Sequence, residues 1–504
     1  MTSPPAPTSA PAQATVTSRR QLWIIFVGLM LSMVLSSLDQ SIVNTALPQM
    51  ASDLGGLAHL SWVVTAFMLC STIANPIYGK LGDMYGRRRL LTASILIFLL
   101  ASTLCGLAQS MPQLILFRAL QGFGAGGLMT LSQTVISEVV SPRERGRYQG
   151  LFTSAFAVSS VSGPLIGGGL TTALSWRWVF YVNLPLGALA LTLILIGLRP
   201  SRRAERHAID YVGAALMACA ATATLLLFTW AGSLFPWASL WTAGLGLAGV
   251  IFWALFLGQE RRAAEPIINL ALFRIRSFTI GVITTSLMAF AMMGTMVFIP
   301  LYFQLVLGFT PAAAGLLLLP QIAMMVISSI LGGHLSSRLG RPKPFMIGGI
   351  ALEALGLSGL ALVAFINAPL PYFLGSMAIL GMGMGIAMPN ATVIVQNAVP
   401  RNTLGVATGT MSFIRSLGGA LGVAVSAGVM SMHLNSNLAD MNTSLDLHAV
   451  IEGGLNIIRT LSPALQLSIA EVFRHSIAYS FLVSGVMMGT AVLLAMMLRG
   501  TEIR

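Results

Sequence analysis

The sequence predicts an all-α polytopic membrane protein with fourteen transmembrane helices. Its composition is the first reason: 56% of the 504 residues are hydrophobic and only 9% are charged, whereas soluble domains carry about 25% charged residues. The second is that apolar runs of about twenty residues, a length that spans a bilayer, recur along the whole chain. The third is that the basic residues cluster in alternate loops between these runs.

The predicted helices follow a short N-terminal tail. Residues 1–20 are rich in Pro, Ala, Thr and Ser and are predicted to form a disordered tail. The apolar segment that follows is too long for the core of a signal peptide, so we interpret it as the first retained helix. The apolar windows place the helices at residues 22–44, 58–79, 90–108, 111–138, 148–173, 178–198, 210–230, 236–257, 278–303, 312–337, 344–366, 371–396, 406–430 and 477–498.

The distribution of positive charge predicts the orientation of the helices. Of the 28 lysines and arginines, 23 fall in one set of alternate loops and three in the other, while Arg118 and Arg415 lie inside predicted helices. Because basic loops stay in the cytoplasm, both termini and the tail are predicted to be cytoplasmic. We expect the protein in the cytoplasmic (inner) membrane of a bacterium, surrounded by lipid. The net charge of +13 then reflects topology, and no nucleic-acid partner is expected.

The chain contains two copies of one six-helix unit. Segments Gly79–Arg89 and Gly333–Lys343 share two glycines, a leucine and an arginine, but Ser337 replaces Asp83. Two related bundles facing each other across a cavity are typical of transporters, although the duplication excludes neither a channel nor a membrane enzyme. The predicted units are an N-terminal bundle (21–200), an inserted helix pair with its flanking loops (201–265), and a C-terminal bundle (266–504) with a long extracytoplasmic loop (431–476).

Four motifs in order along the chain resemble the major facilitator superfamily, and specifically its fourteen-helix branch of drug:proton antiporters. Leu38–Pro48 resembles the helix-1 motif of that branch, Gly79–Arg89 the superfamily loop motif, Arg118–Gly124 the helix-4 motif, and Gly163–Gly168 the helix-5 motif associated with antiporters. The resemblance covers almost the whole chain. It implies the major facilitator fold and multidrug efflux of the kind that gives antibiotic resistance, driven by the proton gradient.

Asp39 is the first candidate for proton coupling, because it lies in the otherwise uncharged apolar run Leu22–Val43. A carboxylate there costs about 2.5–3.5 kcal/mol on insertion scales. At about 1.5 Å per residue, Asp39 and Arg118 both lie in the outer half of the membrane and are expected to meet. A carboxylate whose solvation changes between outward and inward states can load and release a proton, and the resemblance implies the same role. The alternative is a static ion pair that fixes helix packing.

The loop after the second predicted helix is a candidate gate. Gly79 and Gly86 permit a tight turn. Asp83 can accept backbone hydrogen bonds from the N-terminus of a facing helix, and Arg87 can reach Glu138. We interpret these residues as a latch that closes the cytoplasmic side, and the serine in the second copy predicts a weaker latch there. The alternative is that the three arginines only orient the helices.

Gly163 and Pro164 lie within the fifth predicted helix and are further candidates for gating. A proline inside a helix removes a hydrogen bond, and neighbouring glycines allow close packing. The functional interpretation is a pivot that seals the cavity against a proton leak. The alternative is ordinary packing of small residues.

Glu353 and Arg415 are the remaining charged residues at similar depths in predicted helices of the second half. They either pair with each other, or Arg415 faces the cavity alone. Glu353 is a weaker candidate for proton coupling than Asp39, because its helix is peripheral in the fold that the resemblance implies. A packing role for Glu353 remains the alternative.

The substrate cavity is expected to be lined by polar, aromatic and methionine side chains. Methionine-rich and aromatic walls adapt to varied lipophilic ligands. Since the membrane holds few carboxylates, monovalent lipophilic cations or neutral amphiphiles are the expected substrates. The candidate cavity residues are Trp62, Asn75, Gln121, Gln133, Met292, Met296, Tyr302, Gln304, Gln321, Met388 and Asn390.

The leading interpretation is therefore a proton-driven antiporter that exports lipophilic drugs by alternating access. An exporter or flippase of an endogenous lipid or amphiphile uses the same features, and a membrane scaffold without transport activity is a third possibility. No phosphate-binding loop, nucleophile elbow or metal-binding spacing occurs. We accordingly expect no enzyme activity, cofactor or metal. The loop 431–476 steers substrates, gates the outer mouth or contacts an extracytoplasmic partner, or it is a tolerated insertion. Its stretch Leu461–Ser476 is a candidate amphipathic helix on the outer surface.

Overall fold

The computed structural model describes residues 18–55, 59–199, 209–231, 235–439 and 463–498. Within these residues fourteen helices are long and apolar enough to cross a membrane, which confirms the predicted number. The span Trp178–Gly197 contains both α6 and α7, and α11 leads into α12. The helices are α1 (Arg19–Leu54), α2 (Leu60–Tyr85), α3 (Arg87–Leu107), α4 (Met111–Val139), α5 (Arg145–Ala173), α6 (Trp178–Tyr181), α7 (Asn183–Gly197), α8 (Tyr211–Trp230), α9 (Leu240–Glu260), α10 (Arg276–Leu305), α11 (Pro311–Leu316), α12 (Leu319–Leu339), α13 (Pro342–Phe365), α14 (Leu370–Asn397), α15 (Leu404–Ala439) and α17 (Pro463–Met496).

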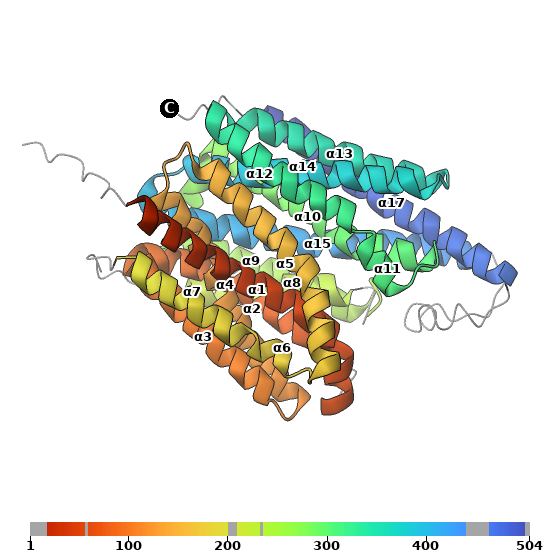
Figure 1. Ribbon diagram of the computed structural model, residues 1–504, viewed down its shortest axis with the longest axis horizontal. Helices are drawn as coiled ribbons and strands as arrows, with labels where there is room; N and C mark the ends of the chain where they lie inside the picture. The colour runs from red at the N-terminus through yellow and green to blue at the C-terminus, as the bar shows by residue number, and fades with distance from the viewer. Residues whose placement is uncertain (1–17, 56–58, 200–208, 232–234, 440–462, 499–504) are drawn as a thin grey trace, which may run out of the picture.

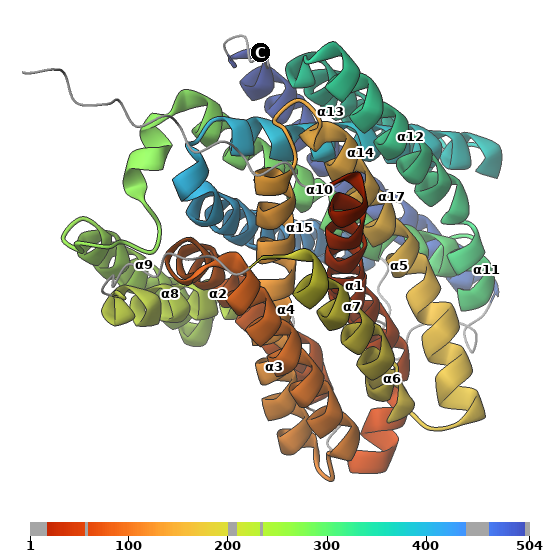
Figure 2. The ribbon, with the colours of Figure 1, turned by 60° about the vertical axis from the view of Figure 1, so that its left-hand side comes forward.

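The helices form two bundles, with a helix pair beside them (Figure 2). Helices α1–α7 make one bundle and α10–α17 the other, each around its own apolar core. The pair α8 and α9 packs on α2 and α15, one helix from each bundle (Figure 2). Trp62 of α2 contacts Trp230 of α8, and Trp253 of α9 contacts Phe413 of α15. The inserted pair therefore lies along the seam between the bundles.

The predicted loop 431–476 is shorter in the structure, and the helix expected over Leu461–Ser476 is, from Pro463 on, part of α17. Helix α15 continues to Ala439 and α17 begins at Pro463, so both borders of the loop are helical, while residues 440–462 lie outside the described residues. Arg474 of α17 donates to the carbonyl oxygens of Ala364 at 2.6 Å and Phe365 at 2.8 Å, at the end of α13. Glu471 and Arg474 interrupt the apolar window of the sequence, but in the structure Arg474 caps a neighbouring helix and pairs with Glu471.

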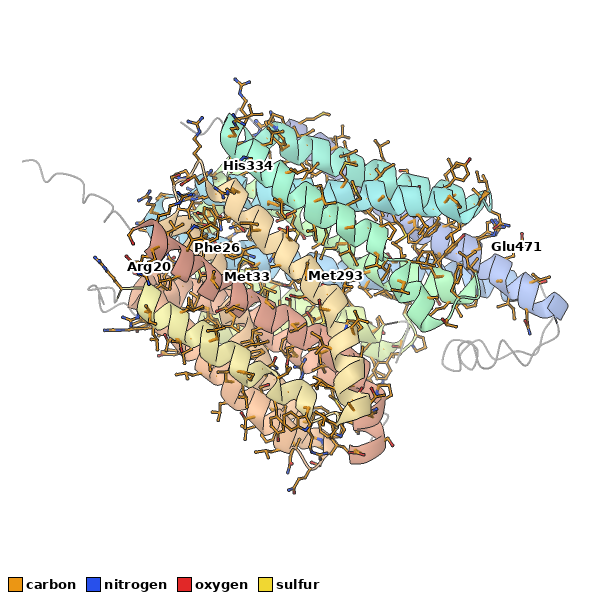
Figure 3. All side chains as sticks on the ribbon, in the orientation of Figure 1. Arg20, Phe26, Met33, Met293, His334 and Glu471 are labelled. Carbon is orange, nitrogen blue, oxygen red and sulfur yellow. The ribbon has the colours of Figure 1, made fainter. Side chains whose placement is uncertain are left out.

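The two bundles meet at one end of the molecule and diverge at the other (Figure 1). Arg20, labelled in Figure 3, lies at the end at which they meet. In the order of the spans, Arg87, Arg143 and Arg338 fall on the same side as Arg20, so we call this end the basic end. Close contacts there join α2 to α15 and α5 to α12. Glycines make these approaches possible: a Cβ on Gly409 would lie 2.6 Å from the Asn75 carbonyl oxygen.

Candidate functional site

A cavity of about 230 Å³ lies between the two bundles, next to the contacts that close the basic end. Helices α1, α2, α4 and α5 line it from one bundle and α10, α14 and α15 from the other. Met33 and Met293, labelled in Figure 3, come from opposite bundles. Its wall combines thioether, aromatic and amide side chains: Met33, Met68, Met129, Met292, Met293 and Met388; Phe67, Phe152 and Phe156; and Gln40, Asn75, Gln133 and Gln149.

The structure places only some of the predicted cavity residues in this wall. Asn75, Gln133, Met292 and Met388 line the cavity. Among the polar residues that the sequence did not single out, Gln40 and Gln149 also line it. Residue type alone indicates a polar position on a helix, but it does not tell which face of the helix the side chain occupies.

The other predicted cavity residues lie elsewhere. Tyr302 is buried in the core of its own bundle, where its ring stacks on Phe373. Asn390 accepts a hydrogen bond from Ser336 within that bundle. Met296 is 50% exposed on the outside of α10. Trp62 contacts the inserted pair. Gln121 belongs to the cluster around Asp39 described below. Gln304 and Gln321 are not among the cavity-lining residues.

The Asp39 carboxylate is fully buried and is held by side chains of α4 and α7. Arg118 Nη1 donates to Oδ2 at 2.6 Å, Gln121 Nε2 donates to Oδ1 at 2.9 Å, and Asn183 Nδ2 donates to Oδ1 at 2.7 Å. Asp39 and Arg118 thus lie together, as their depths in the sequence predicted. Three donors from two helices therefore fix the position of this carboxylate in the closed cluster.

Asn183 is the member of this cluster that sequence reasoning missed. It is fully buried at the start of α7 and also donates to Ser102 Oγ of α3 at 3.0 Å. In the sequence, Asn183 is an isolated amide in the apolar run 178–198. That it binds the Asp39 carboxylate can be recognised only when the neighbouring helix is known. Helices α1, α3, α4 and α7 are therefore tied together through one polar centre.

Phe67 of α2 connects this cluster to the cavity. Its ring lines the cavity wall, and the Arg118 guanidinium carbon lies 4.1 Å from its centroid. Arg118 Nε also donates to the Val63 carbonyl oxygen of α2 at 3.3 Å. Gly122 lets α4 approach α2 here, because a Cβ at that position would lie 2.8 Å from Phe67 Cα. A ligand that displaces Phe67 would thus act directly on the partner of Asp39.

The predicted latch residues lie at the contact between α2 and α15. Asp83 accepts the backbone N–H groups of Gly405 at 3.1 Å and Val406 at 2.9 Å, at the N-terminus of α15. Arg87 bonds Asp83, and its Nε lies 2.6 Å from Glu138 Oε2 of α4. The carboxylate occupies the positive end of the helix dipole. The latch thus joins the two bundles at the basic end. Gly79 faces Gly405 backbone to backbone, and Gly86 has φ 91°, which favours glycine.

The second copy of the loop motif makes the corresponding contact with a neutral group. Ser337 Oγ of α12 accepts the backbone N–H of Arg147 at 2.8 Å, in the first turn of α5. The repeat thus pairs each loop motif with the start of a helix in the opposite bundle. A charged acceptor forms stronger hydrogen bonds than a hydroxyl, so the two latches differ in strength.

A buried amide network, which the sequence analysis did not identify, completes the closure of the basic end. Gln396 of α14 accepts from Ser137 Oγ at 2.6 Å and from Gln149 Nε2 at 3.3 Å, and it donates to the Gln133 carbonyl oxygen at 3.3 Å. Arg145 of α5 also bonds Asn397. Because Gln133 and Gln149 line the cavity, this network forms its floor.

Gly163 and Pro164 lie where α5 packs on α1. A Cβ on Gly163 would lie 2.4 Å from Ser41 Cβ, and Ser41 Oγ donates to the Ser160 carbonyl oxygen at 2.9 Å. Helix α5 continues through Pro164 without a break. The arrangement shows close packing of the two helices; the pivot stays a prediction.

Glu353 and Arg415 do not form the ion pair considered in the sequence analysis. Glu353 of α13 is fully buried, and neither of its carboxyl oxygens has a hydrogen-bond partner among the described residues. It lies behind the cavity wall, in a small void shared with Met292 and Met388. Arg415 of α15 lines the cavity itself. The geometry thus matches the other alternative, in which Arg415 faces the cavity alone.

Comparison with known proteins identifies relatives along most of the chain. The family model described as Major Facilitator Superfamily matches residues 29–423. The multidrug transporter protein MdtP of Bacillus subtilis is 36% identical over 83% of this chain and 77% of its own length. Multidrug resistance protein 3 of the same organism is 34% identical over 82% and 81%, respectively. The solved structure of the proton:xylose symporter XylE shares the fold with a TM-score of 0.64 at 16% identity, covering 94% of this chain and 95% of XylE.

Proposed function

Since the chain belongs to the major facilitator superfamily and is a membrane transporter rather than an enzyme, we propose that it exports lipophilic small molecules in exchange for protons. The observation that carries this proposal is the buried Asp39 cluster joined through Phe67 to a cavity between two bundles. Relatives named for multidrug transport support an export function. The positive charge at the basic end supports an orientation with this end in the cytoplasm of a bacterium.

The contacts at the basic end support alternating access. With Asp83, Ser337 and Gln396 joining the bundles there, the cavity is closed toward the proposed cytoplasm. A proton arriving from outside would neutralise Asp39 and weaken its hold on Arg118. Rearrangement would then open the basic end, where the proton leaves and the next substrate enters. Proton inflow and substrate export share the same conformational cycle.

The proposal is tested in liposomes that contain the purified protein and an imposed pH gradient. Addition of a lipophilic substrate on the cytoplasmic face should accelerate dissipation of the gradient, followed with a pH-sensitive dye. Empty liposomes give the control for passive leak. A substrate that binds the protein without changing the proton flux would contradict antiport and favour a scaffold or binding protein.

The two latches should differ in their contribution to transport. Asp83→Asn removes the ion pair with Arg87 and weakens two charge-assisted hydrogen bonds, which are worth about 1.5–3 kcal/mol each. Ser337→Ala removes a single neutral hydrogen bond, worth about 0.5–1.5 kcal/mol. We expect Asp83→Asn to lower the export rate at least tenfold (about 1.4 kcal/mol) and Ser337→Ala to lower it less. Equal losses in vesicle transport assays would argue against a charged latch.

Glu353 is proposed as a second proton site in the C-terminal bundle. A buried carboxyl group without a partner is far less costly when neutral, and its void adjoins Met292 and Met388 of the cavity wall. Glu353→Gln mimics the protonated acid, so the number of protons exchanged per substrate should fall while substrate binding persists. The measurement is the ratio of proton to substrate flux. An unchanged ratio would leave Glu353 a packing role.

A further inference from the structure

Arg415 is the single charged residue among the described residues that line the cavity. It lies eleven residues into α15, which at about 1.5 Å per residue is roughly 16 Å from the start of that helix, deep in the membrane. No acidic side chain is part of the same wall. Asp39 lies outside it and is already paired with Arg118. The cavity therefore has a net positive charge.

This positive charge is not neutralised by the protein in the closed-basic-end state. Within the part of the chain that the structure describes, Arg415 has no ion pair and donates no hydrogen bond, and both oxygens of Glu353 are likewise without partners. An unpaired guanidinium in a membrane is unfavourable, and such groups are usually paired or functional. The cation is thus available for a ligand that supplies the missing anion.

A second polar group of the same helix face also lacks a partner. Ser412 lines the cavity three residues before Arg415, and its buried Oγ has no hydrogen-bond partner among the described residues. Residues three apart on a helix are neighbours on its surface. A guanidinium beside a free hydroxyl offers several donors, an arrangement that suits a carboxylate.

We propose that Arg415, assisted by Ser412, binds the acidic group of the substrate, and that the preferred substrates are lipophilic organic anions. The apolar body of such a ligand would lie against the thioether and aromatic wall, with Met292, Met388 and Phe152 as neighbours of the same cavity. The inference rests on the proposed export function and specifies its substrate class. It differs from the sequence expectation of monovalent lipophilic cations or neutral amphiphiles, because an uncompensated arginine in the cavity repels cations and gives a neutral ligand no opposite charge to bind.

The charge of the substrate determines how export depends on the membrane potential. For any fixed number of protons moving inward, export of a monovalent anion moves one more positive charge inward than export of a neutral molecule. It moves two more than export of a monovalent cation. An interior-negative potential should therefore accelerate export of the anion most strongly, in addition to the effect of the pH gradient.

The experiment compares three probes that share one aromatic body: naphthaleneacetate, its neutral amide and naphthylmethylammonium. Each is offered to proteoliposomes of the full chain with imposed pH gradients and potassium diffusion potentials, and its binding to the purified protein is measured by calorimetry. The wild type should bind and export the carboxylate at least tenfold better than the ammonium, equivalent to about 1.4 kcal/mol. Decanoate in parallel distinguishes an acyl amphiphile from an aromatic anion as the better ligand.

Two variants isolate the role of Arg415. Arg415→Gln should lose at least tenfold in carboxylate affinity and much less in affinity for the neutral amide, and the remaining amide binding shows that the variant is folded. Arg415→Lys, which keeps the charge but not the planar fork, should restore part of the carboxylate affinity. Unchanged carboxylate binding in Arg415→Gln, or a wild type that prefers the ammonium or the amide, would overturn the inference. Absence of proton flux with every probe would instead refute the proposed antiport.

Discussion

Asp39→Asn should abolish proton-coupled export. The asparagine keeps the size of the side chain but cannot take up and release a proton. In the wild type the carboxylate accepts from Arg118, Gln121 and Asn183 in a fully buried site. Proton arrival therefore has a defined structural consequence, the loss of charge opposite Arg118, which a permanently neutral residue cannot reproduce. In liposomes with a pH gradient, substrate should no longer stimulate proton flux.

The same substitution has a structural cost that must be separated from the loss of coupling. It leaves Arg118 buried without a counter-ion, and removal of one partner of a buried ion pair typically costs about 3–5 kcal/mol. The double variant Asp39→Asn with Arg118→Gln removes both charges. We expect its thermal stability to recover most of the loss seen in Asp39→Asn, whereas coupled export remains absent.

The two outcomes distinguish the proton site from a static ion pair. If the pair only holds α1 against α4, the double variant should regain transport together with stability. Wild-type proton coupling in either variant would refute the assignment of Asp39. Retention of the protein in the membrane fraction and substrate binding by the cavity serve as the controls for folding.

The fold was predictable because the bilayer imposes simple requirements on the sequence. Spanning helices need long apolar windows, and these gave the correct number of helices. The borders of the loop 431–476 show where apolar windows mislead. Glu471 and Arg474 have the charge typical of surface residues, yet Arg474 donates to the final carbonyl groups of α13. A charge that is satisfied by a neighbouring helix end cannot be recognised from one segment.

The candidate site was predictable in its charged members and not in its neutral ones. Asp39 and Arg118 stand out because each is costly in hydrocarbon. Asn183 donates two hydrogen bonds in its cluster and Gln396 takes part in several, but a buried amide in an apolar run has no such energetic signature. The sequence also did not distinguish whether Arg415 pairs with Glu353 or faces the cavity, because this depends on how α13 and α15 face one another.

Glycines at the basic end allow close backbone contacts between the bundles, both where α15 packs on α2 and where α5 packs on α12. Gly409 of α15 faces the backbone of α2, and Gly150 of α5 faces the Ser329 carbonyl oxygen of α12. In each case the obstacle to a side chain is backbone, which cannot move aside as a flexible side chain can. These contacts exist only while the basic end is closed, because they join helices of different bundles. Side chains at these glycines should therefore destabilise one conformational state selectively.

Gly409→Leu is accordingly expected to trap the transporter with the basic end open. Its Cβ would lie 2.6 Å from the Asn75 carbonyl oxygen and 3.0 Å from Pro76 Cα. Overpacking typically costs about 1–3 kcal/mol, which corresponds to a roughly 5- to 150-fold shift in the equilibrium between the two states. Export should fall by a similar factor, since the closed state is needed to release substrate on the far side.

The shift is measured by chemical accessibility from the basic end. In a background with Cys70, Cys105 and Cys219 replaced by serine, a cysteine introduced at Thr392 of the cavity wall should react faster with a membrane-impermeant thiol reagent supplied on that side. Gly348→Leu is the matched control, because nothing lies within 4 Å of a Cβ at that position of α13; it should change neither labelling nor export. If Gly409→Leu exports as the wild type does, or labels no faster than Gly348→Leu, the glycine contact is not part of the gate, and closure of the basic end would have to depend on the hydrogen bonds of Asp83, Ser337 and Gln396.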